Sequence, residues 1–187
     1  MPSAFRVAAG VINPVTGRWM TKTWNFDQIL PEAVETYLTI EQQFGIQVYH
    51  PIPEIRFCQN TEDLKRVGRR MRNPRYQNVL NHMAAAGEAA PEFNDDFGSF
   101  HIDQAAYVDL PLVVHTLRAS FSTLGVFRDE TFLHSELQPG TIGWQYRDLR
   151  ADKVIFCEGA AIQDNPWFKN LPLKPAKGET LLCQSPT

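Results

Sequence analysis

The sequence predicts an α/β fold whose middle part is α+β. Residues 154–156 form a short apolar run of the kind found in a central strand covered on both faces, and small residues follow it. Residues 110–124 carry apolar side chains at helical spacing and stop at Gly125. Residues 52–59 alternate well enough for a half-buried strand. Helices and strands are therefore expected to alternate along the chain.

The N-terminal part is expected to form a turn and then a helix. Residues 3–18 begin with small residues around Gly10 and lack a strand pattern. Residues 31–44 carry apolar side chains at helical spacing, with Pro31 tolerated in the first turn and Gly45 as the C-terminal stop. This pattern predicts an amphipathic helix.

The middle of the chain is expected to mix short strands and helices. A strand at 52–59 leads into a helix that Thr61 caps. Turn signals dominate residues 73–97, where the pattern offers a short helix over 77–85.

The last part predicts strand, helix and strand again. The expected elements are a strand at 98–103, a helix at 110–124, a strand at 125–136, a turn at 138–140 with a return over 141–146, and strands at 154–157 and 178–183. We expect the helix to cover a sheet that contains the strands near 126–134 and 154–157.

The composition is that of a globular protein without a strong electrostatic field. Of the 187 residues, 43% are hydrophobic and 21% are charged, and the formal net charge is −3. This balance disfavours nucleic acid and membrane as partners. The basic run within 65–75 is a local exception, and such a run on a helix is more often a solvated face than an anion or partner site.

Cysteine spacing and hydropathy limit the remaining classes. Cys58, Cys157 and Cys183 lie far apart without C-x-x-C spacing, which disfavours a metal site and a disulfide framework. The sequence has neither an apolar span of about 18 residues nor a basic-then-apolar start. We therefore expect a cytoplasmic protein without a metal.

Two motifs carry a resemblance to a known family. Residues 8–12 read A-A-G-V-I, and residues 154–182 read VIFCEGAAI, then a proline-rich link, then LPLKPAKGETLL. In this order the motifs resemble the FAD-dependent oxidoreductases of the D-amino-acid oxidase and glycine oxidase superfamily. Cys157 and Glu158 depart from the small or polar pair that is usual there.

The resemblance implies a partial FAD-binding Rossmann-like domain joined to part of a mixed-sheet substrate domain. It assigns residues 1–30 to a flavin-contacting segment, 31–105 to the substrate domain, 106–170 to a second pass of the FAD domain, and 171–187 to a return to the substrate domain. It implies FAD as cofactor and a small amine or amino acid as substrate, oxidised by hydride transfer to the flavin.

The same resemblance implies the cofactor-contacting positions but leaves the catalytic residues unknown. These positions are Ser3, Ala9, Gly10, Val11, Ile12, Phe132, Cys157, Gly159 and Ala160. Two alternatives stay open: a small-residue turn without a ligand at 3–12, and a plain core position for Phe132.

The phosphate-binding turn of a dinucleotide fold does not occur in this sequence. No G-x-G-x-x-G is present, and the five histidines show no ligand or catalytic spacing. We therefore expect an internal fragment of an oxidoreductase that binds no flavin by itself, and a homodimer in which uncovered edges pair.

Two other functions remain open at this stage. One is a non-catalytic binding or interaction domain that retains the scaffold without the nucleotide site, and the other is a nucleotide enzyme of an unrelated family. A longer reading frame with an upstream G-x-G-x-x-G would favour the oxidoreductase.

Overall fold

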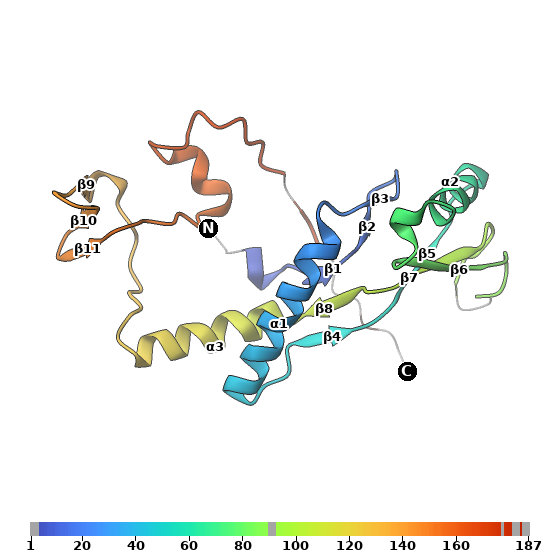
Figure 1. Ribbon diagram of the computed structural model, residues 1–187, viewed down its shortest axis with the longest axis horizontal. Helices are drawn as coiled ribbons and strands as arrows, with labels where there is room; N and C mark the ends of the chain where they lie inside the picture. The colour runs from blue at the N-terminus through green and yellow to red at the C-terminus, as the bar shows by residue number, and fades with distance from the viewer. Residues whose placement is uncertain (1–3, 90–92, 177, 181–183, 185–187) are drawn as a thin grey trace. The chain divides into compact units, whose positions relative to one another are not determined.

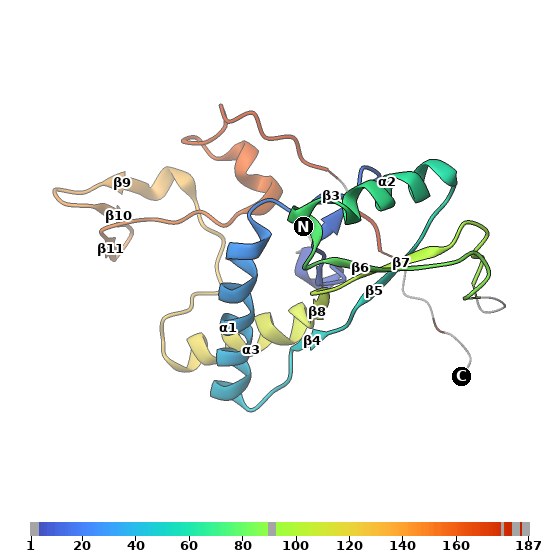
Figure 2. The ribbon, with the colours of Figure 1, turned by 45° about the vertical axis from the view of Figure 1, so that its right-hand side comes forward.

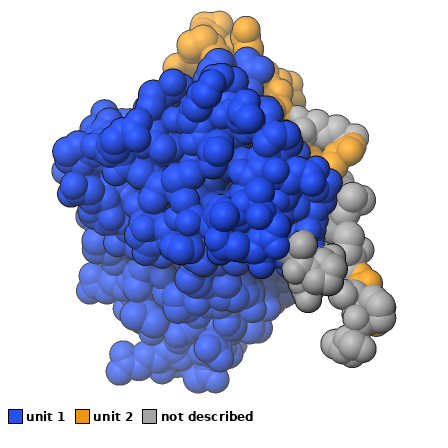
Figure 3. All heavy atoms as spheres, turned by 90° about the vertical axis from the view of Figure 1, so that its right-hand side faces the viewer, with its two compact units in different colours: residues 1–123 blue, residues 124–187 orange. Residues whose placement is uncertain are grey.

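The computed structural model describes residues 4–89, 93–176, 178–180 and 184. The chain (Figure 1) divides into two compact units, residues Met1–Thr123 and Leu124–Thr187, which have different colours in Figure 3. Each unit is described separately.

The first sheet of unit 1 has three antiparallel strands. Its order is β1 (Val11–Ile12), β8 (Ala106–Val108), β4 (Tyr49–Pro51). Apolar side chains of α1 (Phe26–Phe44) and α3 (Leu110–Thr123) pack against this sheet around Val48, Val108 and Val113. These contacts bury the apolar stripes that the sequence places on both helices.

The second sheet of unit 1 is also antiparallel, in the order β5 (Glu54–Phe57), β7 (Ser99–Ile102), β6 (Leu80–Ala84). Helix α2 (Thr61–Met71) covers one of its faces (Figure 2). Phe100 and Ile102 of β7 and Val67 of α2 are completely buried at this contact.

A small hairpin, β2 (Val15–Thr16) and β3 (Thr21–Lys22), follows the 3-10 helix η1 (Ala4–Arg6). Its tip is held by three guanidinium groups. They belong to Arg56, Arg66 and Arg70, and they donate to the carbonyl oxygens of Gly17, Arg18 and Trp19 respectively. The Arg66 and Arg18 guanidinium groups also lie over the Trp19 ring. Part of the basic run within 65–75 therefore has an internal structural role.

Unit 2 is built on one three-stranded meander (Figure 1). Strands β9 (Leu137–Pro139), β10 (Trp144–Tyr146) and β11 (Leu149–Ala151) are antiparallel, with β10 in the centre. The 3-10 helices η3 (His134–Glu136) and η4 (Gly159–Asp164) flank the meander in the sequence, and η2 (Pro74–Tyr76) belongs to unit 1.

The mixed α/β class that the sequence predicts is confirmed, although every strand pair among the described residues is antiparallel. The strand at 52–59 is present as β5, and the one at 98–103 as β7. The helix at 110–124 is α3, and Gly125 after it has a left-handed φ of 69°.

Several element boundaries differ from the prediction in unit 1. Helix α1 begins at Phe26, so Pro31 lies inside it and not in its first turn. The cap of α2 is Asn60, whose side chain accepts from the Asp63 amide, so Thr61 is already helical. The short helix predicted at 77–85 is wrong, because β6 forms there and pairs with β7.

The strands predicted at 125–136 and 154–157 are wrong. Neither segment pairs with a strand among the described residues. Ile155 is 85% exposed, whereas a central strand would bury it. Phe156 instead packs against other aromatic rings of unit 2. The predicted packing of residues 110–124 on those strands is wrong too, because α3 packs against β4 and β8. The strand predicted at 178–183 lies partly outside the described residues, and 178–180 form no strand.

Candidate functional site

The predicted site residues of unit 1 lie on and before the edge strand β1. Gly10 has a φ of +67°, and a Cβ on it would clash with the carbonyl oxygen of Val108. The Val108 amide donates to the Gly10 carbonyl at 3.0 Å. The glycine is therefore needed for close packing of β1 against β8, whichever ligand the segment contacts.

The neighbours of Gly10 differ in exposure. Ala9 and Val11 are exposed, and Ile12 is half-buried because it packs against both hydrophobic cores of unit 1. Strand β1 has one edge on β8 and an open edge among the described residues. Ser3 lies outside the described residues.

The other four predicted residues lie in unit 2. Phe132 is stacked on Tyr146, with ring centroids 4.4 Å apart, and its edge meets Phe156. Cys157, Gly159 and Ala160 follow Phe156 and are exposed. The ring contact thus brings the Phe132 segment beside the 157–160 turn.

Gly159 meets the requirement for close approach of another molecule. Its φ is +57°, and no atom of the chain lies within 4 Å of the position that a Cβ would take. The backbone at 157–160 therefore leaves room for a bound group such as FAD, whereas at Gly10 the strand β8 occupies that space.

A cavity of about 850 Å³ adjoins Phe132 in unit 2. Its wall includes Arg128, Phe132, Trp144, Tyr146, Lys153 and Ile155. It therefore combines aromatic surface with two cationic side chains and one carboxylate, that of Glu130. One more cation than carboxylate lines it, which favours a planar ligand that carries negative charge.

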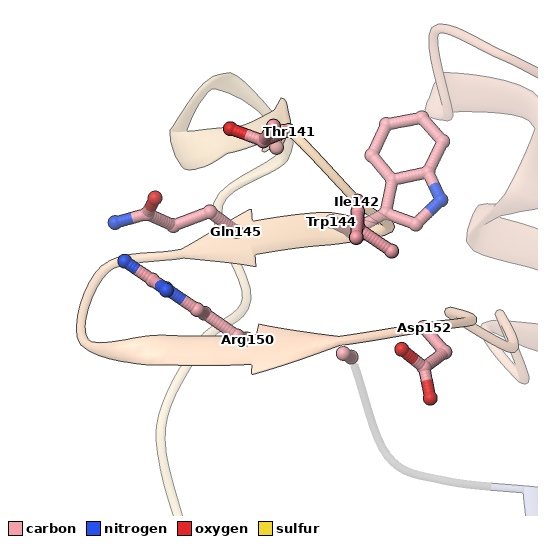
Figure 4. Close-up of a pocket in the computed structure, with 8 residues that line it drawn as sticks. Thr141, Ile142, Trp144, Gln145, Arg150 and Asp152 are labelled. Carbon is pink, nitrogen blue, oxygen red and sulfur yellow. The ribbon is translucent and has the colours of Figure 1, made fainter.

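A second hollow, of about 450 Å³, lies along the β10–β11 hairpin (Figure 4). Gln145 and Arg150 are directly opposite each other on the two strands, and Asp152 lies further along. None of the predicted cofactor residues lines this hollow. We therefore place the candidate site at the larger cavity and the 157–160 turn.

Two charged side chains that line the larger cavity, Arg128 and Glu130, form ion pairs. Both terminal nitrogens of Arg128 donate to the Asp148 carboxylate, at 2.9 and 2.7 Å. These bonds hold the pKa of Asp148 down at about 2. Arg147 bonds Glu136 and Glu130 beside them, and its hydrogen bonds lower the pKa of Glu136. Arg128 is thus partly neutralised, and Lys153 is the more available cation.

An aromatic cluster around this site was not predicted from the sequence. The cluster consists of Phe132, His134, Trp144, Tyr146, Phe156, Trp167 and Phe168. His134 also bonds Glu158, which in turn bonds Asn165. The high aromatic density of 132–168 was the available signal, but no spacing rule connects these positions.

The described part of the chain contains no group of three or more His, Cys, Asp or Glu side chains that could hold a metal ion. None of its helices is both long enough and apolar enough to cross a bilayer.

Comparison with known proteins gave two findings. The family model for FAD dependent oxidoreductase (DAO) matches residues 4–187. Among solved structures, the chain is similar to the iminodiacetate oxidase IdaA from Chelativorans sp. BNC1, with 24% identity and a TM-score of 0.42. That alignment covers 64% of this chain and 35% of the oxidase.

Proposed function

The chain belongs to the FAD-dependent oxidoreductase family, and from this premise we propose that it supplies flavin-facing and substrate-facing parts of an enzyme that oxidises a small amine or amino acid. The match of the family model over residues 4–187 carries the proposal. The open turn at Gly159 supports it, because it leaves backbone accessible where the family motif implies a cofactor contact.

When bound, FAD supplies the acceptor for the hydride that leaves the substrate. The work left to the protein is to bind and orient both molecules and to exclude water. In unit 2, the 157–160 turn would offer exposed backbone, and Phe132, which is 37% exposed, would offer ring surface. Lys153 would place a positive charge at the cavity wall.

The pyrophosphate of FAD needs donors that the proposed contacts do not include. In dinucleotide folds it lies on a glycine-rich turn at a helix N-terminus, and no G-x-G-x-x-G occurs among the 187 residues. We therefore propose that tight binding of FAD requires a polypeptide that carries this turn in addition to these residues.

The cofactor contact is tested by adding bulk at one exposed alanine of η4 and at its neighbour. In a polypeptide that contains these residues together with a glycine-rich dinucleotide turn, Ala160→Val should weaken FAD binding about tenfold or more, because the added methyl groups occupy the approach to the turn. Ala161→Val is the matched control, since Ala161 is also exposed and lies in the same 3-10 helix.

The measurement is the FAD dissociation constant from flavin fluorescence, with a thermal melt to compare folding. Equal affinities for the two variants and the unmodified protein would contradict the contact. Turnover of a panel of small amines and amino acids, followed by reduction of an artificial electron acceptor, tests the substrate class separately.

A further inference from the structure

Glu158 is the residue that departs from the family motif, and its carboxylate has two partners. One oxygen, Oε1, lies 2.6 Å from Nε2 of His134. The other, Oε2, accepts from the side-chain amide of Asn165 at 2.8 Å. The side chains of Glu158 and His134 are only 20% and 25% exposed, and Asn165 is completely buried. Both carboxylate oxygens are thus used inside unit 2.

Asn165 connects this carboxylate to the backbone on both sides of it. Its amide donates to the carbonyl of Ile162 and so closes the end of η4. Its side-chain oxygen accepts from the Trp167 amide at 3.0 Å, and its carbonyl accepts from Phe168 and Lys169. The backbone of this buried residue therefore ends η4 and starts the following turn, and its side chain bonds Glu158 and the Trp167 amide.

The histidine lies in an aromatic environment. Its ring centroid is 5.7 Å from that of Phe132, 5.9 Å from Phe156 and 6.1 Å from Trp167. Where water is largely excluded, an unmade hydrogen bond leaves a desolvated polar group, which costs more than the made bond gains. Removal of the Glu158 carboxylate would leave two such groups, on His134 and on Asn165.

We infer that Glu158, with His134 and Asn165, forms a clasp that positions the cofactor-contacting turn. Glu158 and Asn165 directly flank η4 (Gly159–Asp164), so their side-chain bond ties the two ends of that helix together. His134 ties the same carboxylate to the segment of Phe132, two residues earlier.

The clasp reaches every cofactor position proposed for unit 2. Cys157 and Gly159 adjoin Glu158, Ala160 lies two residues after it, and Phe132 lies two residues before His134. Glu158 acts through these positions, so its role is to position them. This last step rests on the proposed function, whereas the clasp itself rests on the hydrogen bonds alone.

Three variants separate the clasp from general effects on folding. Glu158→Ala removes both bonds. Glu158→Gln is the conservative variant, because its amide oxygen can accept from Asn165 while its nitrogen donates to a neutral His134 ring. Glu136→Ala is the control, since it removes an ion-paired carboxylate of the same unit that bonds Arg147 and not η4.

Amide hydrogen exchange at Asn165, Phe168 and Lys169 reports on the clasp in the chain itself. Glu158→Ala should accelerate exchange at least about tenfold, which corresponds to about 1.4 kcal/mol. Glu158→Gln and Glu136→Ala should stay within about threefold of the unmodified chain. If Glu158→Ala unfolds unit 2, Glu158→Asp replaces it, since its shorter side chain cannot reach both partners. Unchanged exchange in Glu158→Ala or in Glu158→Asp would overturn the clasp.

The positioning role is measured as FAD affinity in the same polypeptide that contains the glycine-rich turn. Glu158→Ala should weaken it about tenfold, and Glu158→Gln should restore it. If Glu158→Ala leaves the affinity unchanged while Ala160→Val lowers it, the positioning role is overturned and the proposed contact stands. If neither substitution lowers it, the proposed contact at this turn fails, and the positioning role fails with it.

Discussion

At Gly10 the chain combines a left-handed φ with a steric requirement, and these can be separated by a matched pair of substitutions. Gly17 has a similar φ of +65°, but no atom lies within 4 Å of its Cβ position. Gly17→Ala should therefore cost only the backbone strain, about 1–2 kcal/mol of unfolding free energy. Gly10→Ala adds the clash with the Val108 carbonyl and should cost roughly 3 kcal/mol or more.

Urea unfolding measures both free energies. Equal losses for the two variants would mean that β1 can move away from β8 without cost, and the packing role of Gly10 would then be wrong. This comparison matters for function, because a glycine in the A-A-G motif is also what close approach of a flavin would require. At Gly10, the close packing of β1 against β8 is enough to explain why the residue is a glycine.

The ion pair between Arg128 and Asp148 predicts a dependence of stability on acid. Its bonds lower the pKa of Asp148 from 3.8 to about 2. The pair therefore stabilises the folded chain above pH 3.8, and this contribution is lost as the pH falls toward 2. Asp148→Asn should lower the thermal midpoint slightly at pH 7, and the difference should vanish near pH 2.

Asp152→Asn provides the comparison for this titration. Asp152 is exposed, follows the same hairpin, and has no ion pair among the described residues. A difference between Asp148→Asn and the unmodified chain that persists unchanged at pH 2 would show that the carboxylate acts through something other than its charge.

At the scale of elements, the sheet β5-β7-β6 has one covered face and one more open face. Phe100 of β7 is completely buried against the core that α2 completes. Phe100→Ala should lower the unfolding free energy by about 3–5 kcal/mol, because it leaves a cavity there. Ile55 of β5 is 52% exposed, and Ile55→Ala should cost about 1 kcal/mol or less. Denaturant titration measures the unfolding free energy of both variants. Similar losses would mean that the face of the sheet with Phe100 is not the one that forms the core.

The elements that could be predicted from the sequence are those whose signals are local. The stripe of α3, the stop at Gly45 and the alternation of β5 each depend on residues within a few positions of one another. Residues 154–157 could not be predicted in this way. An apolar run does not reveal its partners, and Phe156 finds them in Phe132 and Trp167, which are 24 and 11 residues away in the sequence.

The same distinction holds for the candidate site. Gly159 could be proposed as a cofactor contact because its motif is contiguous, and it stays a prediction. For Glu158, the sequence indicates only a departure from the family pattern. Its partners, His134 and Asn165, are set by the tertiary structure of unit 2, so their role could be recognised only from coordinates.

Taken as a whole molecule, the 187-residue chain should bind FAD only weakly. The two phosphates of FAD need several charge-assisted hydrogen bonds, each worth about 1.5–3 kcal/mol. Every 1.4 kcal/mol is a factor of ten in affinity, so the absence of the glycine-rich turn should reduce binding by several orders of magnitude. The purified 187-residue chain should therefore be colourless.

An absorbance spectrum and a titration with FAD, followed by tryptophan fluorescence, provide the measurement. Trp144 lines the cavity beside Phe132, and Trp167 contacts both Phe156 and His134, so quenching would report a flavin at the candidate site. Riboflavin, which lacks phosphates, is the control ligand. If the pyrophosphate is the missing contact, riboflavin and FAD should bind about equally weakly. A yellow protein would contradict this prediction, and so would FAD that binds at micromolar concentration far more tightly than riboflavin. Either result would show that donors within these residues hold the phosphates. Lys153 and Arg128 at the cavity wall would be the first candidates.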